Sequence, residues 1–214
     1  MVTTALEFGL ERLYKASSKE VDFVEVPALN FVMLDGTGDP NTSQAYKAAL
    51  EVLYAISYGL KFALKREQEL EYHVHPLEGL WWADDMAEFS VERKVNWKWT
   101  MMIAQPDAVT TDRFATVRDD VARKKSLAAL SKARLEEFDE GYCAQILHIG
   151  PYSAEGPTIA RLHAFIREHG YRFDGRRQKH HEIYLGDPRR VAPAKWRTII
   201  RQPMAQPGGN AGPP

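Results

Sequence analysis

A glutamate near the C-terminal end is the residue best placed for acid or base chemistry. Glu182 lies between His181 and Ile183, in a segment whose other residues favour a buried strand. A buried carboxylate is costly unless it meets a partner, water or a cation, and burial raises its pKa toward the range of a general acid or base. The alternative is that Glu182 faces solvent or pairs with a neighbouring arginine. We therefore take Glu182 as the first catalytic candidate.

Aromatic side chains are concentrated on the segments that accompany this glutamate. Flat aromatic walls suit polycyclic or cationic ligands. The candidate ligand-binding residues are Trp81, Trp82, Trp99, Tyr142 and Tyr184. Core packing explains any one tryptophan equally well, and two adjacent residues on a regular strand must point to opposite faces. The aromatic set as a whole favours a binding groove.

Other kinds of chemistry have weaker signals. His73 and His75 are two residues apart, but the chain has no HExxH motif and no cluster of histidine with cysteine, so we expect neither a metal nor a cofactor. Cys143 is the only cysteine and lies among alternating apolar residues, which is typical of a small core side chain rather than a nucleophile.

Composition excludes several classes of protein. The 214 residues are 44% hydrophobic and 27% charged, which is typical of a globular protein. The formal net charge of −1 provides no field to hold a polyanion or an anionic membrane, so we expect no nucleic-acid or membrane partner. The first twelve residues contain two glutamates and no apolar run, so we read no secretion signal and expect a cytoplasmic protein, either a monomer or a homodimer.

Hydrophobic periodicity predicts an alternation of strands and helices. Strands are expected at 21–26, 31–34, 78–83, 95–103, 142–149, 180–185 and 195–202, and helices at 43–65, 110–125 and 157–169. We divide a single domain, 1–203, into a first module at about 21–106, connector helices at about 107–138 and a second module at about 139–203. The uncharged residues 204–214 are expected to be a disordered tail.

The two halves share a closing segment. Residues 98–106 and 195–203 agree at five of nine positions, including the Lys-Trp start and the Gln-Pro end. Chance convergence of two amphipathic strands is the alternative. Duplication predicts an α+β fold of two βαββ modules in a pseudo-twofold arrangement. Antiparallel sheets would carry helices on one face, and the other face would line a ligand groove between the modules. It also places Glu78 at the position of Glu182, which makes Glu78 the second acid or base candidate.

Four segments resemble the family of GyrI-like small-molecule-binding proteins: 26–40, Pro76-Leu-Glu-Gly-Leu-Trp-Trp82, Gly150-Pro-Tyr152 and His181-Glu-Ile-Tyr-Leu185. The resemblance covers about residues 20–203. It implies two βαββ modules around a ligand groove, with Glu182 at the position of the family's central glutamate.

The segment ending in Trp82 resembles a stand-alone branch with cyclopropanoid hydrolase members. That resemblance implies detoxification by hydrolysis of strained, electrophilic cyclopropanes of the duocarmycin and yatakemycin type. Family members joined to a DNA-reading helix-turn-helix act as multidrug sensors, and the twenty residues before the first strand are too few for such a domain. The alternatives are sequestration of lipophilic or cationic drugs, and a protein-interaction module such as a gyrase modulator.

The resemblance also suggests how such a site would work on a small aromatic or lipophilic ligand. Glu182 would orient or deprotonate the attacking water. Tyr152 or Tyr184 would donate a hydrogen bond to the dienone oxygen as it becomes a phenolate. The tryptophans would stack on the flat substrate and exclude bulk water.

Overall fold

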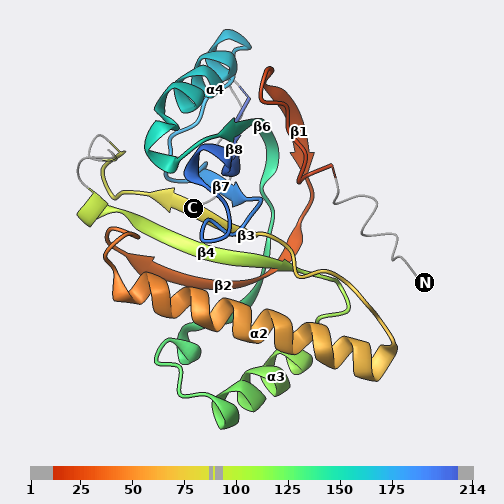
Figure 1. Cartoon of the computed structure of the whole chain (residues 1–214). Coiled ribbons are helices and arrows are strands. Elements are labelled where there is room, and N and C mark those ends of the chain that lie inside the picture. The colour runs from red at the N-terminus through yellow and green to blue at the C-terminus, as the bar shows by residue number, and fades with distance from the viewer. Residues whose placement is uncertain (1–11, 87–88, 90–93, 207–214) are drawn as a thin grey trace.

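One continuous antiparallel sheet forms the centre of the protein in the computed structural model, which describes residues 12–86, 89 and 94–206 (Figure 1). The strands are β1 (Asp22–Val26), β2 (Leu29–Thr37), β3 (Leu77–Trp82), β4 (Lys98–Gln105), β5 (Arg134–Phe138), β6 (Gly141–Ile149), β7 (His180–Tyr184) and β8 (Arg197–Pro203). The α-helices in the described part of the chain are α2 (Gln44–Gln68), α3 (Thr111–Lys124) and α4 (Gly156–Glu168).

The strand order confirms two βαββ modules related by a pseudo-twofold axis. The order is β1-β6-β8-β7-β3-β4-β2-β5, so each module arranges its strands as first, third and second. The modules meet where β3 pairs with β7. β1 leaves the first module to pair with β6, and β5 leaves the second to pair with β2. The β3–β7 pairing joins the two modules into one sheet, and each outer edge of that sheet is completed by a strand from the other half of the chain.

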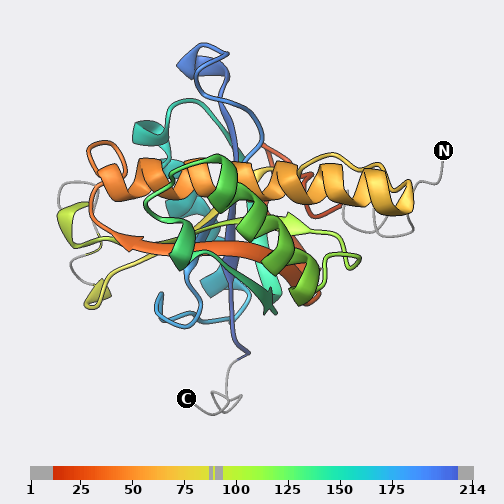
Figure 2. The ribbon, with the colours of Figure 1, turned by 90° about the horizontal axis from the view of Figure 1, so that it is seen from below.

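Helix α2 covers the first module and forms the largest part of the core. The Ser43 hydroxyl caps it by accepting from the backbone N–H of Tyr46, and the helix ends where Glu69 takes a left-handed conformation with φ of 54°. Its apolar period buries one side against the sheet, including Leu53, Ile56 and Leu60. Helix α3 packs against the outer side of α2 (Figure 2).

A glycine makes room for the largest side chain of this core. Trp99 on β4 is fully buried opposite Gly36 on β2. A Cβ at Gly36 would lie 2.1 Å from the Trp99 ring, so only glycine leaves space for the indole. Trp99 is therefore a core residue beneath α2, and its predicted role as a ligand contact is wrong.

The face of the sheet opposite the helices is covered by the N-terminal segment. The backbone N–H of Leu147 donates to the carbonyl of Ser17 at 2.9 Å, and the Gln145 amide donates to the carbonyl of Lys15 at 3.1 Å. The prediction that the ligand groove lies on the face without helices is therefore wrong. α2 and α4 flank the other face and leave its central strands, β3 and β7, uncovered between them (Figure 1).

Several boundaries also differ from the prediction. The strand expected from residue 95 begins at Lys98, after a 3₁₀ helix at Lys94–Asn96. Residues 134–138, expected in a helical connector, form β5, because pairing with the free edge of β2 satisfies their backbone and the charged side chains suit an edge strand. In the expected disordered tail, Met204 is buried and Ala205 bridges to Arg172, so order extends past residue 203. Residues 207–214 lie outside the described part. Over the described residues, no helix has the length and apolarity to cross a membrane.

Candidate functional site

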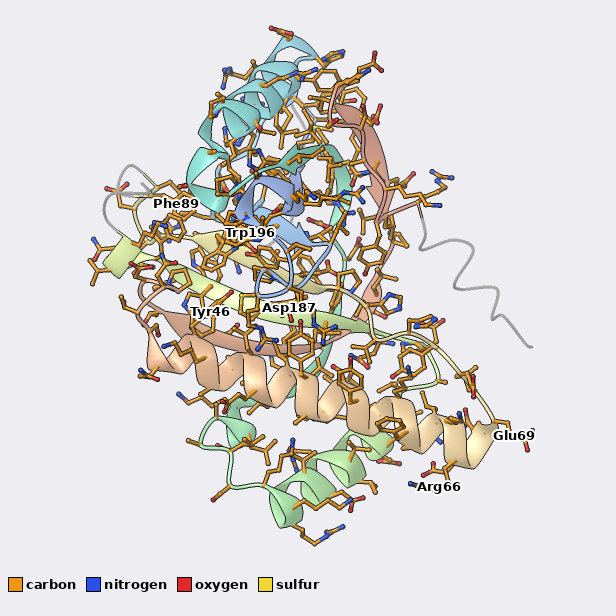
Figure 3. All side chains as sticks on the ribbon, in the orientation of Figure 1. Tyr46, Arg66, Glu69, Phe89, Asp187 and Trp196 are labelled. Carbon is orange, nitrogen blue, oxygen red and sulfur yellow. The ribbon has the colours of Figure 1, made fainter. Side chains whose placement is uncertain are left out.

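A groove of about 1990 Å³ lies between α2 and α4 and exposes the middle of the sheet. It is lined from widely separated parts of the chain, as Tyr46 on α2, Phe89 before β4 and Asp187 after β7 illustrate (Figure 3). Cavities for drug-sized ligands measure roughly 300–1,000 Å³, so the groove has room for a large ligand. The residues able to do chemistry lie at its floor.

Glu182 is held at the floor by a chain of hydrogen bonds. Tyr184 donates from its hydroxyl to Oε2 of Glu182 at 2.8 Å, and Trp81 donates from Nε1 to the Tyr184 hydroxyl at 3.1 Å. Glu182 and Tyr184 share a face because they are two residues apart on β7, and Trp81 comes from the adjoining strand β3. Burial is the main cause that raises the pKa of Tyr184 well above its usual value, and the charge of Glu182 raises it further. The Tyr184 hydroxyl therefore keeps its proton and can donate a hydrogen bond.

The second oxygen of Glu182 faces a histidine. Nε2 of His180 lies 3.2 Å from Oε1 of Glu182, and the two side chains are only 8% and 13% exposed. With Nε2 protonated, His180 donates this bond while Tyr184 donates the other. The carboxylate is therefore oriented through both oxygens and remains open to the groove.

A second carboxyl, which the sequence analysis missed, lines the same groove. Glu155 immediately precedes helix α4, is 4% exposed, and its Oε1 has no hydrogen-bond partner among the described residues. Burial, followed by the charge of Glu182, raises the pKa of Glu155 to about 9, so it is protonated at neutral pH. In the sequence, Glu155 directly precedes Gly156-Pro157, where a glutamate is explained by the favourable interaction of a negative charge with the N-terminus of a helix. The sequence therefore gives no sign that Glu155 is buried.

Tyr152 lies in the groove as predicted, on the turn before α4. Its ring centroid is 4.8 Å from that of Trp196 and 5.6 Å from that of Tyr184. Burial, and then the charges of Glu182 and Glu155, raise the pKa of Tyr152, which keeps the hydroxyl protonated. The sheet and the turn thus bring Tyr152, Tyr184 and Glu182 together.

Glu78 lies on the opposite face of the sheet, so its predicted place in the groove is wrong. Its carboxylate accepts from the Tyr14 hydroxyl at 2.8 Å and lies 3.0 Å from Nε2 of His181. Across the β3–β7 pairing, Glu78 is opposite Ile183, whereas Gly79 is opposite Glu182. A side-chain period of two then sends the two glutamates to opposite faces.

The sheet register also corrects the repeat alignment. Leu77 pairs with Ile103 and Glu182 pairs with Ile200, and these isoleucines are matched positions of the closing segments. The counterpart of Glu182 in the first module is therefore Leu77, not Glu78. The central glutamate occurs once in the duplicated fold.

Two further predicted ligand contacts lie away from the groove. Trp82 is on the face opposite α2, where Nζ of Lys179 lies 3.9 Å from the centre of its ring. Tyr142 is at the sheet margin, with its ring centroid 5.4 Å from that of Phe23. Neither lines the groove, whereas Trp81 and Trp97 do. Because adjacent residues on a strand point to opposite faces, only one of Trp81 and Trp82 can face the groove. The sequence alone does not show which one does.

The histidines are used in other ways. His75 stacks on Tyr14, with ring centroids 5.5 Å apart, and His180 is beside Glu182. Among the residues whose placement is described, no group of three histidine, cysteine or acidic side chains is arranged to hold a metal ion.

Comparison with solved structures finds similar proteins from Listeria innocua. An uncharacterized conserved protein from that organism is 36% identical, with a TM-score of 0.86, over 94% of this chain and 98% of its own. A structure described as a hydrolase from Listeria innocua is 35% identical, with a TM-score of 0.80, over 92% and 98%. The C-terminal domain of EcmrR, at 12% identity and a TM-score of 0.56 over 88% and 98%, shares the fold.

A comparison with curated proteins finds no match. The model of the GyrI-like small molecule binding domain, by contrast, matches residues 19–204, which include both modules, the whole groove and both carboxyls at its floor. The chain therefore belongs to the GyrI-like small-molecule-binding domain family.

Proposed function

We propose that this protein hydrolyses electrophilic cyclopropanes fused to flat, conjugated ring systems, and so removes their power to alkylate. The observation that carries the proposal is the pair of carboxyls at the floor of an aromatic groove, with Glu182 oriented by two neighbours and Glu155 protonated. A pair of titratable groups with different environments is the arrangement that acid and base catalysis requires. Similarity to a Listeria protein described as a hydrolase supports the same class of activity.

In the proposed reaction, Glu182 takes a proton from water as the water oxygen attacks the methylene carbon of the cyclopropane. The ring C–C bond breaks, and its electron pair passes through the conjugated system to the carbonyl oxygen, which becomes a phenolate. Glu155 gives its proton to that oxygen. Solvent then returns the proton from Glu182 to Glu155, so the net change is the addition of one water. The driving force is formation of the aromatic ring.

The neighbouring side chains have supporting roles in this scheme. Burial and the charge of Glu182 raise the pKa of Glu155 to about 9, so Glu155 carries the proton that this step needs at neutral pH. Tyr152 donates a hydrogen bond to the developing phenolate. Tyr184 and His180 act through Glu182 as positioning residues. The partly exposed ring of Trp97 and other groove residues stack on the substrate, whereas Trp81, which is 3% exposed, acts through its hydrogen bond to Tyr184.

The test is incubation of the purified protein with a duocarmycin-type spirocyclopropane, followed by mass spectrometry. Wild-type protein is expected to yield many equivalents of product heavier by one water. Glu182→Gln keeps the size of the side chain but cannot act as a base, and we expect turnover to fall at least 100-fold. Full turnover by a normally folded E182Q would contradict the assignment.

Sequestration of lipophilic cations without chemistry is the second candidate. Acidic groups within aromatic walls also suit a flat cation, and Glu155 could ionise to match its charge. In that case the wild-type protein would bind the spirocyclopropane or a lipophilic cation tightly, and no hydrated product would form beyond the rate in buffer.

A further inference from the structure

The segment between α2 and β3 forms one wall of the groove. We call residues 69–76 the connector. It has neither helix nor strand structure and runs from the end of α2 back to the centre of the sheet (Figure 1). Val74, His75 and Pro76 of the connector line the groove. The contacts that hold the connector therefore control the width of the groove at this end.

The connector has few contacts of its own that resist opening. Within the described chain, residues 71–74 make no backbone-to-backbone hydrogen bond. The Tyr72 ring is buried in the core, but its buried hydroxyl has no hydrogen-bond partner among the described residues, which is unfavourable. The salt bridge from Lys65 to Glu71, at 2.6 Å, is exposed, and such pairs add little stability. A segment with these features opens locally more readily than the sheet.

Tyr14 contacts the connector from the other face of the sheet. Its ring stacks on that of His75, with centroids 5.5 Å apart and planes inclined by 20°. Its hydroxyl donates to Oε1 of Glu78 at 2.8 Å, just after the connector enters β3. Burial, followed by the charge of Glu78, raises the pKa of Tyr14 well above its usual value, so the hydroxyl keeps its proton. Tyr14 thus holds both the connector and the strand that follows it.

The neighbours of Tyr14 are fixed to the second module. Leu13 is buried, and its carbonyl accepts from the guanidinium of Arg201 on β8 at 2.5 Å. The carbonyl of Lys15 accepts from the Gln145 amide on β6 at 3.1 Å. The N-terminal segment therefore connects a wall of the groove in the first module to strands of the second.

We propose that the connector is a gate at this end of the groove and that Tyr14 is its latch. When Tyr14 leaves His75 and Glu78, the connector moves away from the sheet and widens the groove, so that a ligand can enter or leave. Opening also brings the Tyr72 hydroxyl into contact with water, which offsets part of the lost packing. That the ligand is a cyclopropane rests on the proposed function, whereas the movement of the gate does not.

The test is limited proteolysis of the full-length protein by a glutamate-specific protease, with the fragments identified by mass spectrometry. Cleavage after Glu71 requires the protease to bind Tyr72 as well, so the Tyr72 ring must leave the core. We expect Tyr14→Ala, which removes both contacts, to speed this cleavage about tenfold. Tyr14→Phe removes only the bond to Glu78, and His75→Ala removes only the stack, so each should give a smaller increase.

Cleavage after Glu51, in the middle of α2, reports unfolding of the helix in the same samples. We expect wild-type protein to be cleaved after Glu71 at least ten times faster than after Glu51. Tyr142→Ala is the matched control, since Tyr142 is 37% exposed but lies outside the groove, and it should leave the rate at Glu71 unchanged. Equal rates at Glu71 and Glu51 in every protein, or an unchanged rate at Glu71 in Y14A, would overturn the proposal.

Stopped-flow binding of rhodamine 6G, a fluorescent lipophilic cation, tests whether the gate controls access. A latch affects the path and not the bound state, so Y14A should raise the association and dissociation rates about equally and keep Kd within twofold. A weaker Kd with an unchanged association rate would make Tyr14 a support of the binding surface and not a latch. Neither measurement involves turnover, so the gate and the proposed hydrolysis can fail independently.

Discussion

Glu155 and Glu182 show how one groove gives two identical side chains different surroundings. Glu182 is hydrogen-bonded to Tyr184 and lies beside His180, whereas Oε1 of Glu155 lacks a partner within the described structure. Burial of Glu155 disfavours its charged form, and the nearby charge of Glu182 disfavours it further. The result is that Glu155 carries a proton at neutral pH, beside a glutamate whose carboxylate is oriented by hydrogen bonds.

The protonation of Glu155 predicts a high-pH limit to activity. The general acid must carry its proton, so kcat/KM for cyclopropane hydration should be constant near neutral pH and fall as the pH rises through about 9. Glu155→Gln should lower kcat/KM about 100-fold at pH 7 and remove the fall near pH 9. The measurement is a pH profile of both proteins between pH 6 and 10. An unchanged alkaline limb in E155Q would assign the limb to another group.

At the scale of single residues, the sequence predicts some of the residues that line the candidate site but not all of them. Glu182 is predicted because a carboxylate in an apolar strand is costly to bury without a partner. Tyr152 and Tyr184 are predicted from the Gly150-Pro-Tyr152 and His181-Glu-Ile-Tyr-Leu185 segments. Glu155 was missed because its burial depends on how α4 packs on the sheet. Glu78 was misplaced because an error of one residue in a strand alignment sends the side chain to the other face.

Among the elements, β3 matters most for the geometry of the site because Gly79 is paired with Glu182 on the same face. A Cβ at Gly79 would lie 2.9 Å from Nε1 of Trp81, the donor to Tyr184. Gly79→Ala should therefore displace the indole, loosen the Tyr184 to Glu182 bond and lower kcat about tenfold, with a smaller effect on KM.

A double-mutant cycle tests this route. Tyr184→Phe removes the hydroxyl that connects Trp81 to Glu182, and we expect a loss in kcat similar to that of G79A. If G79A and Y184F both act by weakening the hydrogen bond from Tyr184 to Glu182, the kcat of the double variant should be no lower than that of Y184F alone. Multiplicative losses in kcat would show that Gly79 affects turnover by another path.

Periodicity located the three α-helices of the described part of the chain to within a few residues, because amphipathic spacing and caps are local signals. β5 was not found, because its charged residues give no alternating apolar pattern and its partner, β2, is about a hundred residues away. The face that carries the groove was also predicted wrongly. The groove lies on the helix side because residues 12–17 cover the opposite face of the sheet. No local sequence pattern predicts that these residues do so.

Considered as a whole, the molecule has its candidate site on one face of the sheet and a buried ionic network on the other. His181 lies 3.0 Å from Glu78 and 2.7 Å from Glu140, and Arg201 binds Glu140 at 3.1 Å. The same guanidinium donates to the carbonyl of Leu13 at 2.5 Å. The network thus ties the N-terminal segment to strands of both modules.

This network predicts that stability declines at alkaline pH. Burial opposes the charge on His181, but Glu140 and Glu78 outweigh it and raise the pKa from 6.5 to about 9. A raised pKa gives stability that is complete below about pH 6.5 and is lost as the pH rises through about 9. The expected loss is about 1.4 kcal/mol per pH unit for one proton, measured as the free energy of unfolding in urea from pH 6 to 9.

Loss of the Glu155 proton also lowers the free energy of unfolding as the pH rises. A variant is therefore needed to separate the contribution of Glu155 from that of His181. Its pKa is raised from 4.5 to about 9, and the folded state therefore binds a proton that the unfolded state has lost throughout this range. Glu155→Gln should make the decline shallower without abolishing it. If E155Q were equally stable at pH 6 and pH 9, the network around His181 would not hold a proton as described.

The most direct test of the account compares two glutamates on neighbouring strands that face opposite sides of the sheet. Glu182→Gln and Glu78→Gln each replace a carboxylate with an amide of the same size, one in the groove and one in the buried network. Turnover of a duocarmycin-type cyclopropane is measured for both variants by the appearance of the hydrated product, per mole of folded protein. We predict a loss of at least 100-fold in E182Q and nearly wild-type turnover in E78Q. Loss of turnover in E78Q with full turnover in E182Q would place the chemistry on the other face and contradict the account.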